Sequence, residues 1–280
     1  MSDNEFMGFV PGDNRNVWRI QENINLSDVE ESLPGGLYQL EVGLGGTYFY
    51  NRKVVTDKLV SLADQTMSDL NRNISTFYSE ETRQVYKDFG QVHRRGILLY
   101  GPPGSGKTSI INQIMSRVIS EFNGICFINP DPRTFSSVMN RVLTREPNRH
   151  LMVVFEDFEN KANDSRLLAL LDGELKVPNT LYIATTNYVK NLEPRMVNRP
   201  SRFAEVIKIG ALDAAGRKDF LQAHIPAAYL ERVNLDEWAE ASDGLMIDHL
   251  KHLAQCVFVY GLTLPQACER MRNMGKFDET

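Results

Sequence analysis

One stretch of eight residues, Gly101-Pro102-Pro103-Gly104-Ser105-Gly106-Lys107-Thr108, limits what this chain can fold into more than any other part of it. It fits the phosphate-binding pattern G-x-x-x-x-G-K-[ST] at every fixed position. An apolar run over residues 96–100 precedes it, and apolar residues at helical spacing follow over residues 108–115. A strand, a glycine-rich loop and a helix in this order direct backbone N–H groups at a phosphate, which a plain glycine turn would not need. The pattern therefore predicts that Lys107 reaches the phosphates of a bound nucleotide and that Thr108 holds Mg²⁺.

Composition and charge exclude several classes of protein. The 280 residues are 42% hydrophobic and 24% charged, so a globular fold with a sizeable core is expected. The net charge of −5 argues against a nucleic-acid coat or a polybasic membrane anchor. No apolar run approaches the ~18 residues of a membrane span, and residues 1–10 lack the apolar core of a signal peptide. The three cysteines, Cys126, Cys256 and Cys268, are expected to be buried and reduced. Together these features predict a soluble, cytoplasmic protein without membrane contact.

Residues 1–55 differ in character from the rest of the chain. Two strand-like runs, residues 37–42 and 47–50, flank a glycine-rich turn and predict a β-hairpin, with a third strand over residues 16–20. This small β-containing module either recognises a ligand or packs on the main domain, and the residues leave both readings open. Apolar residues at helical spacing predict a linking helix within residues 56–74.

From residue 75 to about 210 the pattern is that of an α/β domain. Continuous apolar runs, typical of parallel strands, occur at residues 125–128, 151–155, 181–184 and 205–209. Helical patterns lie between them over residues 134–143 and 167–171. Residues 211–280 read as helices only, over 214–224, 235–241, 247–259 and 264–272. We therefore expect a doubly wound parallel sheet of the P-loop type with a helical lid behind it.

Polar residues follow the predicted strands where nucleotides bind in open α/β sheets. Glu156 and Asp157 end one strand, where one carboxylate can order Mg²⁺ and the other can act as the catalytic base. Asn187 ends the next strand, where an amide can orient water or simply form a turn. Arg199 and Arg202 precede the last strand. Arginines there can stabilise charge in phosphoryl transfer, although surface salt bridges are the simpler explanation for such a pair.

Taken in order, these residues resemble the AAA ATPases. The resemblance covers about residues 75–275 and rests on an ordered set of motifs: residues 89–90, 95–108, 156–157, 170–173, 185–187, 199–203 and 216–224. Within the AAA group, Arg94-Arg95-Gly96 and the order Glu-Asp are most similar to the Rieske-protein translocase of mitochondria and its bacterial and viral relatives. The membrane helix of that translocase has no counterpart in residues 1–55.

The resemblance implies a role for each matching residue. Pro103, Gly104, Ser105, Gly106, Lys107, Thr108 and Ser109 would form the Walker A contacts with ATP. Glu156, which shares Mg²⁺ with Thr108, and Asp157 would be Walker B. Asn187 would be the polar residue called sensor one. Arg199 and Arg202 would be the arginine fingers, which act on ATP bound to a neighbouring subunit. Phe89 and Gly90 would lie beside the adenine, and His224 near the nucleotide from the lid.

Three departures from the family pattern qualify this picture. The Walker B order is reversed, which places a shorter carboxylate at the base position. Ile247-Asp248-His249 replaces the Gly-Ala-Asp segment of the lid, so the resemblance does not extend to a contact between that segment and phosphate. No aromatic-apolar-Gly pore loop occurs in residues 129–135, and Phe135 is expected in the core. Remodelling or moving a folded partner fits this absence better than threading an unfolded chain.

The sequence thus predicts an ATP hydrolase that assembles into a homo-oligomeric ring, a hexamer or heptamer, and acts on an unidentified protein substrate. Two alternatives from other classes remain open. One is a nucleic-acid-associated loader of the helicase or clamp loader type, although nothing in the chain specifically supports nucleic acid as a partner. The other is a nucleotide-switched binding protein that hydrolyses slowly.

Overall fold

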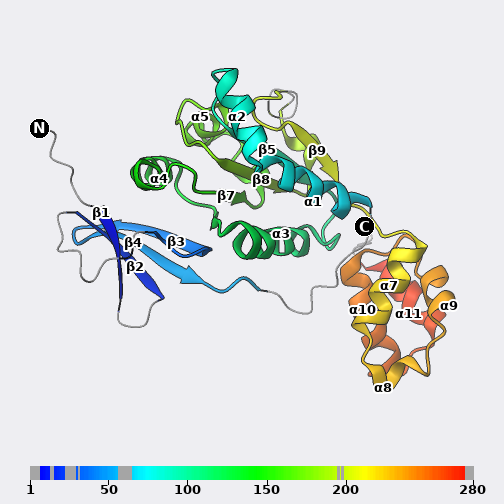
Figure 1. Ribbon diagram of the computed structural model, residues 1–280. Coiled ribbons are helices and arrows are strands. Elements are labelled where there is room, and N and C mark those ends of the chain that lie inside the picture. Colours follow the sequence, from blue (N-terminus) through cyan, green and yellow to red (C-terminus); the bar gives the residue numbers. More distant parts are fainter. Residues whose placement is uncertain are drawn as a thin grey trace, which may run out of the picture.

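The computed structural model describes residues 7–12, 16–22, 30, 32–55, 65–193, 196 and 199–274. Within them, one nine-stranded sheet has the order β1-β2-β4-β3-β6-β7-β8-β5-β9 (Figure 1). Its strands are β1 (Met7–Pro11), β2 (Val17–Glu22), β3 (Gly36–Gly43), β4 (Gly46–Arg52), β5 (Arg94–Tyr100), β6 (Ile125–Ile128), β7 (Leu151–Phe155), β8 (Thr180–Thr186) and β9 (Glu205–Lys208).

The helices lie on the faces of the sheet and in a separate group at the C-terminal end. They are α1 (Gln65–Phe77), α2 (Glu80–Asp88), α3 (Lys107–Phe122), α4 (Pro132–Arg145), α5 (Ser165–Asp172), α7 (Ala214–His224), α8 (Ala227–Leu230), α9 (Leu235–Ala241), α10 (Ile247–Phe258) and α11 (Leu264–Asn273). Two short 3₁₀ turns, η2 (Phe158–Asn160) and η3 (Val189–Asn191), follow β7 and β8. The expected strands and the four expected lid helices are confirmed to within a few residues. The part of the linking helix over residues 56–64 lies outside the described residues.

The central strands β6, β7, β8, β5 and β9 are all parallel, as a doubly wound α/β domain requires. Successive side chains of a strand point to opposite faces, so each strand contributes to two hydrophobic cores. Leu99 and Val154 pack in the core that contains residues of α1 and α3. Leu98 and Val153 pack in the other core, with residues of α4 and α5. The α/β prediction is therefore confirmed, and helices cover both faces of the sheet.

The N-terminal strands continue the central sheet. The hairpin of β3 and β4 forms as expected, but β3 also pairs in parallel with β6, with Leu37 opposite Cys126. The side chain of Arg149 donates to the Leu33 carbonyl oxygen, and Glu146 accepts from the Leu33 N–H, which joins this region to the end of α4. Of the two readings left open by the sequence, packing on the main domain is the one observed. The predicted domain boundaries at residues 55, 74 and 210 stay predictions.

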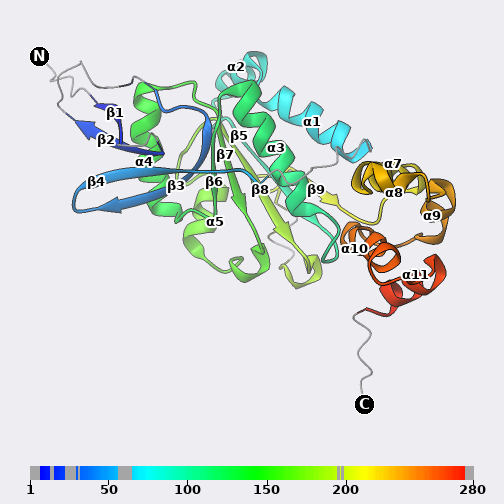
Figure 2. The same ribbon diagram turned by 90° about the horizontal axis from the view of Figure 1, so that it is seen from below.

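The lid lies at the other end of the molecule from the N-terminal strands (Figure 2). Its buried side chains, among them Leu221 and Leu250, belong to the same core as Ile110 of α3, so the lid packs on the α/β domain. The three cysteines are buried and unpaired, as expected. None of the helices in the described ranges is long and apolar enough to cross a membrane.

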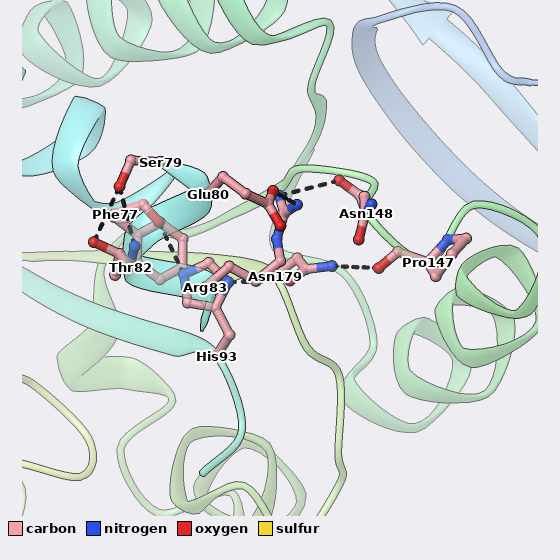
Figure 3. A network of polar contacts seen from close by, with 9 residues as sticks. All are labelled: Phe77, Ser79, Glu80, Thr82, Arg83, His93, Pro147, Asn148 and Asn179. Carbon is pink, nitrogen blue, oxygen red and sulfur yellow. Dashed lines mark hydrogen bonds and ion pairs between the residues drawn. The ribbon is translucent and has the colours of Figure 1, made fainter. Parts of the chain in front are cut away.

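A polar network fastens the amino end of β5 to the helices before it (Figure 3). The His93 ring nitrogens lie 2.8 Å from the Phe77 carbonyl oxygen and 3.0 Å from Oδ1 of Asn179. Asn179 in turn donates to the carbonyl oxygen of Pro147 over 2.7 Å. Burial lowers the pKa of His93. The network holds the start of β5, and the carboxyl end of this strand carries the glycine-rich loop.

Candidate nucleotide site

The glycine-rich loop leaves β5 after Tyr100 and enters α3 at Lys107. Gly104 and Gly106 have φ angles of 74° and 96°, a region that favours glycine because it has no Cβ. A Cβ on Gly101 would collide with the carbonyl oxygen of Ile209, at the end of β9. The motif therefore requires its glycines for backbone conformation and close packing, and it places the N-terminus of α3 at the carboxyl edge of the sheet.

Lys107 is buried under the loop. Its ammonium donates to the carbonyl oxygens of Gly101 and Pro102, over 2.8 and 3.0 Å, and lies 3.4 Å from the Ser105 hydroxyl. Burial lowers the pKa of Lys107, while the negative charges of Glu159 and Asp157 oppose that shift. A buried cation held by loop carbonyls is suited to exchanging them for phosphate oxygens, which carry more negative charge.

The acidic pair follows β7. Glu156 is half-buried, and its backbone N–H donates to Oδ1 of Asn129 at the end of β6, over 3.1 Å. Asp157 is exposed and has a φ angle of 48°, in the left-handed region. Lys161 donates to the Glu156 carbonyl oxygen over 3.3 Å. Burial lowers the pKa of Lys161, and the charges of Asp157 and Glu156 oppose this.

A cavity of about 410 Å³ gathers most of the predicted site residues. It is lined by Pro103, Gly104, Gly106, Lys107, Thr108, Ser109, Glu156, Asp157, Thr185 and Asn187, together with two residues of the lid. Ser105 is fully buried inside the loop. Residues from three strand ends therefore meet around one cavity, because the carboxyl ends of parallel strands share one edge of the sheet.

The two lid residues are Asp248 and Lys251, which the sequence interpretation did not place here. The backbone N–H of Asp248 donates to the Gly104 carbonyl oxygen over 3.2 Å, and Ile247 lies against Gly106. The ammonium of Lys251 is 3.1 Å from Oδ1 of Asp248. The resemblance implied no phosphate contact for this lid segment, and the structure adds that the first turn of α10 packs directly on the loop. The spacing of three between Asp248 and Lys251, which puts both on one helix face, was the available signal.

Three predicted nucleotide contacts lie away from this cavity. Phe89 and Gly90 follow α2 at the amino end of β5, and the seven residues of that strand extend over about 20 Å before the loop begins. Phe89 is 75% exposed. The His224 ring, at the end of α7, stacks on Phe220 and does not line the cavity. The structure therefore gives no support to a role beside adenine for residues 89–90, and places His224 as a half-buried packing residue.

The two arginines lie toward the amino end of β5. The backbone after Arg202 pairs with Gly96, in the first half of the strand: Ala204 donates to the Gly96 carbonyl oxygen over 2.9 Å. Arg202 is buried and makes two bonds to the Asp172 carboxylate, of 2.7 and 2.6 Å. These bonds hold the pKa of Asp172 below its usual value. The guanidinium of Arg199 is 57% exposed and lies 3.5 Å from the same carboxylate.

A second cavity, of about 470 Å³, is larger than the one at the loop. It lies at this amino end and is lined by Tyr86, Gln91, Val92, Arg94, Arg95, Gly96, Asp172, Gly173, Pro200, Ser201 and Ala204. None of the residues predicted to contact nucleotide within the same chain lines it. The arginine segment is therefore separated from the chain's own glycine-rich loop by most of the length of β5.

Parallel central strands, a glycine-rich loop that opens α3 and an acidic pair at the end of β7 define a P-loop nucleoside triphosphatase domain. Residues 97–211 match the model of the AAA family, ATPase family associated with various cellular activities. Residues 97–211 therefore correspond to an AAA ATPase family domain.

The chain is similar to several larger AAA proteins. It is 27% identical over 199 residues to the cell division cycle protein 48 homolog of Archaeoglobus fulgidus, and the aligned segment covers 64% of this chain and 27% of that protein. It is 27% identical over 192 residues to a proteasome-activating nucleotidase of Methanococcus maripaludis, covering 60% and 46%. The human ATPase family gene 2 protein homolog A is 30% identical over 159 residues, covering 50% and 18%. The matched segment thus spans less than half the length of each of these relatives.

Proposed function

We propose that this chain binds ATP with Mg²⁺ between the glycine-rich loop and the lid, hydrolyses it within a homo-oligomeric ring, and uses the cycle to remodel or move a protein partner. The observation that carries the proposal is the single cavity where Lys107, Glu156, Asp157 and Asn187 meet. These side chains supply a cation for phosphates, two carboxylates and a neutral amide, which together are the groups that ATP hydrolysis needs.

The oxygen ligands that would hold Mg²⁺ are the hydroxyl of Thr108 and the carboxylate of Glu156, since both residues line the cavity. Hard oxygen donors, few in number, are what Mg²⁺ uses when substrate phosphates complete its coordination. The bound ion would neutralise charge on the phosphates. Asp157 is exposed at the cavity and would take a proton from the attacking water, which the amide of Asn187 would orient.

The ring part of the proposal rests on the place of the arginines. Arg199 and Arg202 lie toward the amino end of β5, too far along the strand to serve the loop of their own chain. An arginine that completes the site of a neighbouring subunit accounts for this position. A hexamer or heptamer would provide every site with such a neighbour.

A protein is the favoured partner because the relatives include a proteasome-activating nucleotidase. The net charge of −5 does not favour nucleic acid as the partner. Phe135 is fully buried against Phe127, in agreement with its expected core position, so it is unsuited to gripping a threaded chain. We therefore propose that the chain remodels a folded partner. We also propose that it is related to the Rieske-protein translocase. The three buried thiols suit a reducing compartment, and we propose that the chain acts in the cytoplasm.

Replacing Lys107 with Ala should abolish most ATP binding, because it removes the buried cation at the phosphates. We expect the dissociation constant to rise by about two orders of magnitude, the scale on which a buried charged contact is lost. Isothermal titration with ATP and Mg²⁺ measures this directly. Lys87→Ala, at an exposed position on α2, is the matched control. Unchanged affinity of the Lys107→Ala protein would remove the proposed site.

The lid pair should affect ATP affinity in opposite directions. Lys251→Ala removes a positive charge from the cavity and should weaken ATP binding by about three- to tenfold, whereas Asp248→Asn removes a negative charge and should strengthen it. Lys218→Ala is the control, because Lys218 forms a similar exposed lid ion pair, with Asp236, outside the cavity. Equal effects of Lys251→Ala and Lys218→Ala on the dissociation constant would contradict a phosphate contact from α10.

A further inference from the structure

Glu159 is an acidic residue beside the site that the proposed mechanism does not use. It lies in η2, two residues after Asp157, and does not line the cavity. The left-handed conformation of Asp157 turns the chain after β7. The next residue, Phe158, is fully buried with its ring edge-on to Phe203, 5.3 Å between centroids. This anchor fixes the turn that brings Glu159 to the end of β8.

The carboxylate of Glu159 connects two catalytic segments. Its Oε1 accepts a hydrogen bond from the backbone N–H of Asn187 over 3.4 Å. The turn that carries Glu159 closes by itself, since Asn160 donates to the Asp157 carbonyl oxygen over 3.0 Å and Lys161 to that of Phe158 over 2.9 Å. The side chain of Glu159 is therefore not required to form its own turn, and its bond acts on Asn187.

The second carboxylate oxygen of Glu159 argues against a purely structural role. Among the described residues, Oε2 of Glu159 is inaccessible to solvent and has no hydrogen-bond partner. A buried, unsatisfied carboxylate oxygen is unfavourable for stability, so such a group in a native protein requires an explanation, and a catalytic role is one. The negative charge of Glu159 also opposes the effect of burial on the pKa of Lys107.

We propose that Glu159 is a positioning residue, which holds the backbone of Asn187 and thereby sets the amide side chain for phosphoryl transfer. The inference rests on the proposed function, because Asn187 orients the attacking water only if the site hydrolyses ATP. On the other side of Asn187, the N–H of Tyr188 donates to Oγ1 of Thr186 over 3.0 Å. The two bonds together fix the turn in which Asn187 lies, and the loss of one displaces its side chain.

Two conservative variants separate position from charge. Glu159→Gln keeps an acceptor oxygen at the same reach and removes the charge, whereas Glu159→Asp keeps the charge and shortens the side chain by one methylene. Because a displacement near 1 Å can cost about 10² in rate, we expect kcat of the Gln variant to exceed that of the Asp variant about tenfold. The KM for ATP should change by less than about threefold in both. The readout is steady-state ATPase activity, with the thermal unfolding midpoint confirming that each variant is folded.

A double-mutant cycle tests whether Glu159 acts through Asn187. In the Asn187→Ala background the change from Glu159 to Asp should lower kcat by less than about threefold, since the group that it positions is gone. An Asp variant as active as the Gln variant, or losses that multiply independently in the cycle, would overturn the inference. A parent protein that does not hydrolyse ATP would remove the proposed function itself. An active parent with the reversed order of the two variants removes only the role of Glu159.

Discussion

The Arg199→Ala variant should bind ATP with the affinity of the parent protein, and its hydrolysis rate should be lower by at least about 10³-fold. Arginine fingers supplied by a neighbour contribute about 10³–10⁵ in rate where they have been measured. Arg199 fits this role better than Arg202, because its guanidinium is 57% exposed and makes one long contact with Asp172, of 3.5 Å. The measurement is ATPase activity per subunit across a dilution series, alongside the dissociation constant for ATP.

Mixed rings provide the sharper test of this prediction. A large excess of Lys107→Ala subunits, which keep Arg199 but cannot bind ATP, should restore activity to Arg199→Ala subunits, which bind ATP but lack the arginine. Arg72→Ala, at an exposed position on α1, is the control and should need no rescue. Full activity of Arg199→Ala alone, or activity per subunit that stays constant down to a demonstrated monomer, would contradict a finger acting between subunits.

Arg202 is expected to behave differently, which makes Arg202→Ala an informative contrast. Its buried guanidinium forms two bonds to Asp172, so truncation leaves a partly buried carboxylate with only the long contact to Arg199 and should lower stability by about 3 kcal/mol. The pKa of Asp172 lies below its usual value in the folded protein, so the stability from this pair is present above the unfolded-state pKa. It is lost as the pH falls through the lowered pKa. A thermal unfolding series between pH 7 and acid checks this for the parent and the variant.

Asp157→Asn should keep ATP binding and lose turnover by about 10²–10⁴-fold, because an amide cannot take the proton of the attacking water. The substitution suits this position, since Asp157 has a φ angle of 48° and Asn tolerates the left-handed region well. Single-turnover hydrolysis with saturating Mg²⁺ measures the chemical step. Asp88→Asn, an exposed position on α2, serves as the control.

The reversed Walker B order makes the outcome of Asp157→Asn decisive. Glu156 precedes it in the cavity and is assigned to Mg²⁺ with Thr108. If Asp157→Asn turns over ATP at the parent rate, the base must be another carboxylate, Glu156 or Glu159. A Glu156→Gln variant that then also keeps its Mg²⁺ titration unchanged would remove Glu156 from the metal as well.

Hydrophobic periodicity predicted most elements of this fold, because strands buried on both faces leave continuous apolar runs. β7, with five buried residues, and β8, with seven, are such strands. Four of the lid helices were also predicted from the sequence, whereas the four-residue α8 was not. The short strand β1 and helix α2 were not predicted, and α2 shows why: none of its residues is buried, so it leaves no apolar pattern to read.

Pairing between distant segments was beyond the reach of any local pattern. The alternation in β3 predicted a hairpin, but whether its outer edge remains open or pairs with β6 depends on which backbone lies beside it in space. The same limit applies to Phe89 and Gly90, for which only the resemblance to the AAA ATPases implied a position beside adenine. In the fold, the length of β5 separates them from the loop.

The sequence by itself determined the phosphate-binding loop, because Gly104 and Gly106 must adopt φ angles that other residues avoid and Lys107 must follow them directly. It also indicated the two strands that are followed by Glu156 and by Asn187, since each apolar run and the polar residue after it are local features. Only the tertiary structure decided that Asp248 and Lys251 line the cavity and that Glu159 bonds to Asn187. It also decided that Arg202 is buried in its bonds to Asp172 while Arg199 stays exposed. These pairs are brought together by packing of separate helices and strands, and the free energy of such contacts depends on distances that no spacing along the chain specifies.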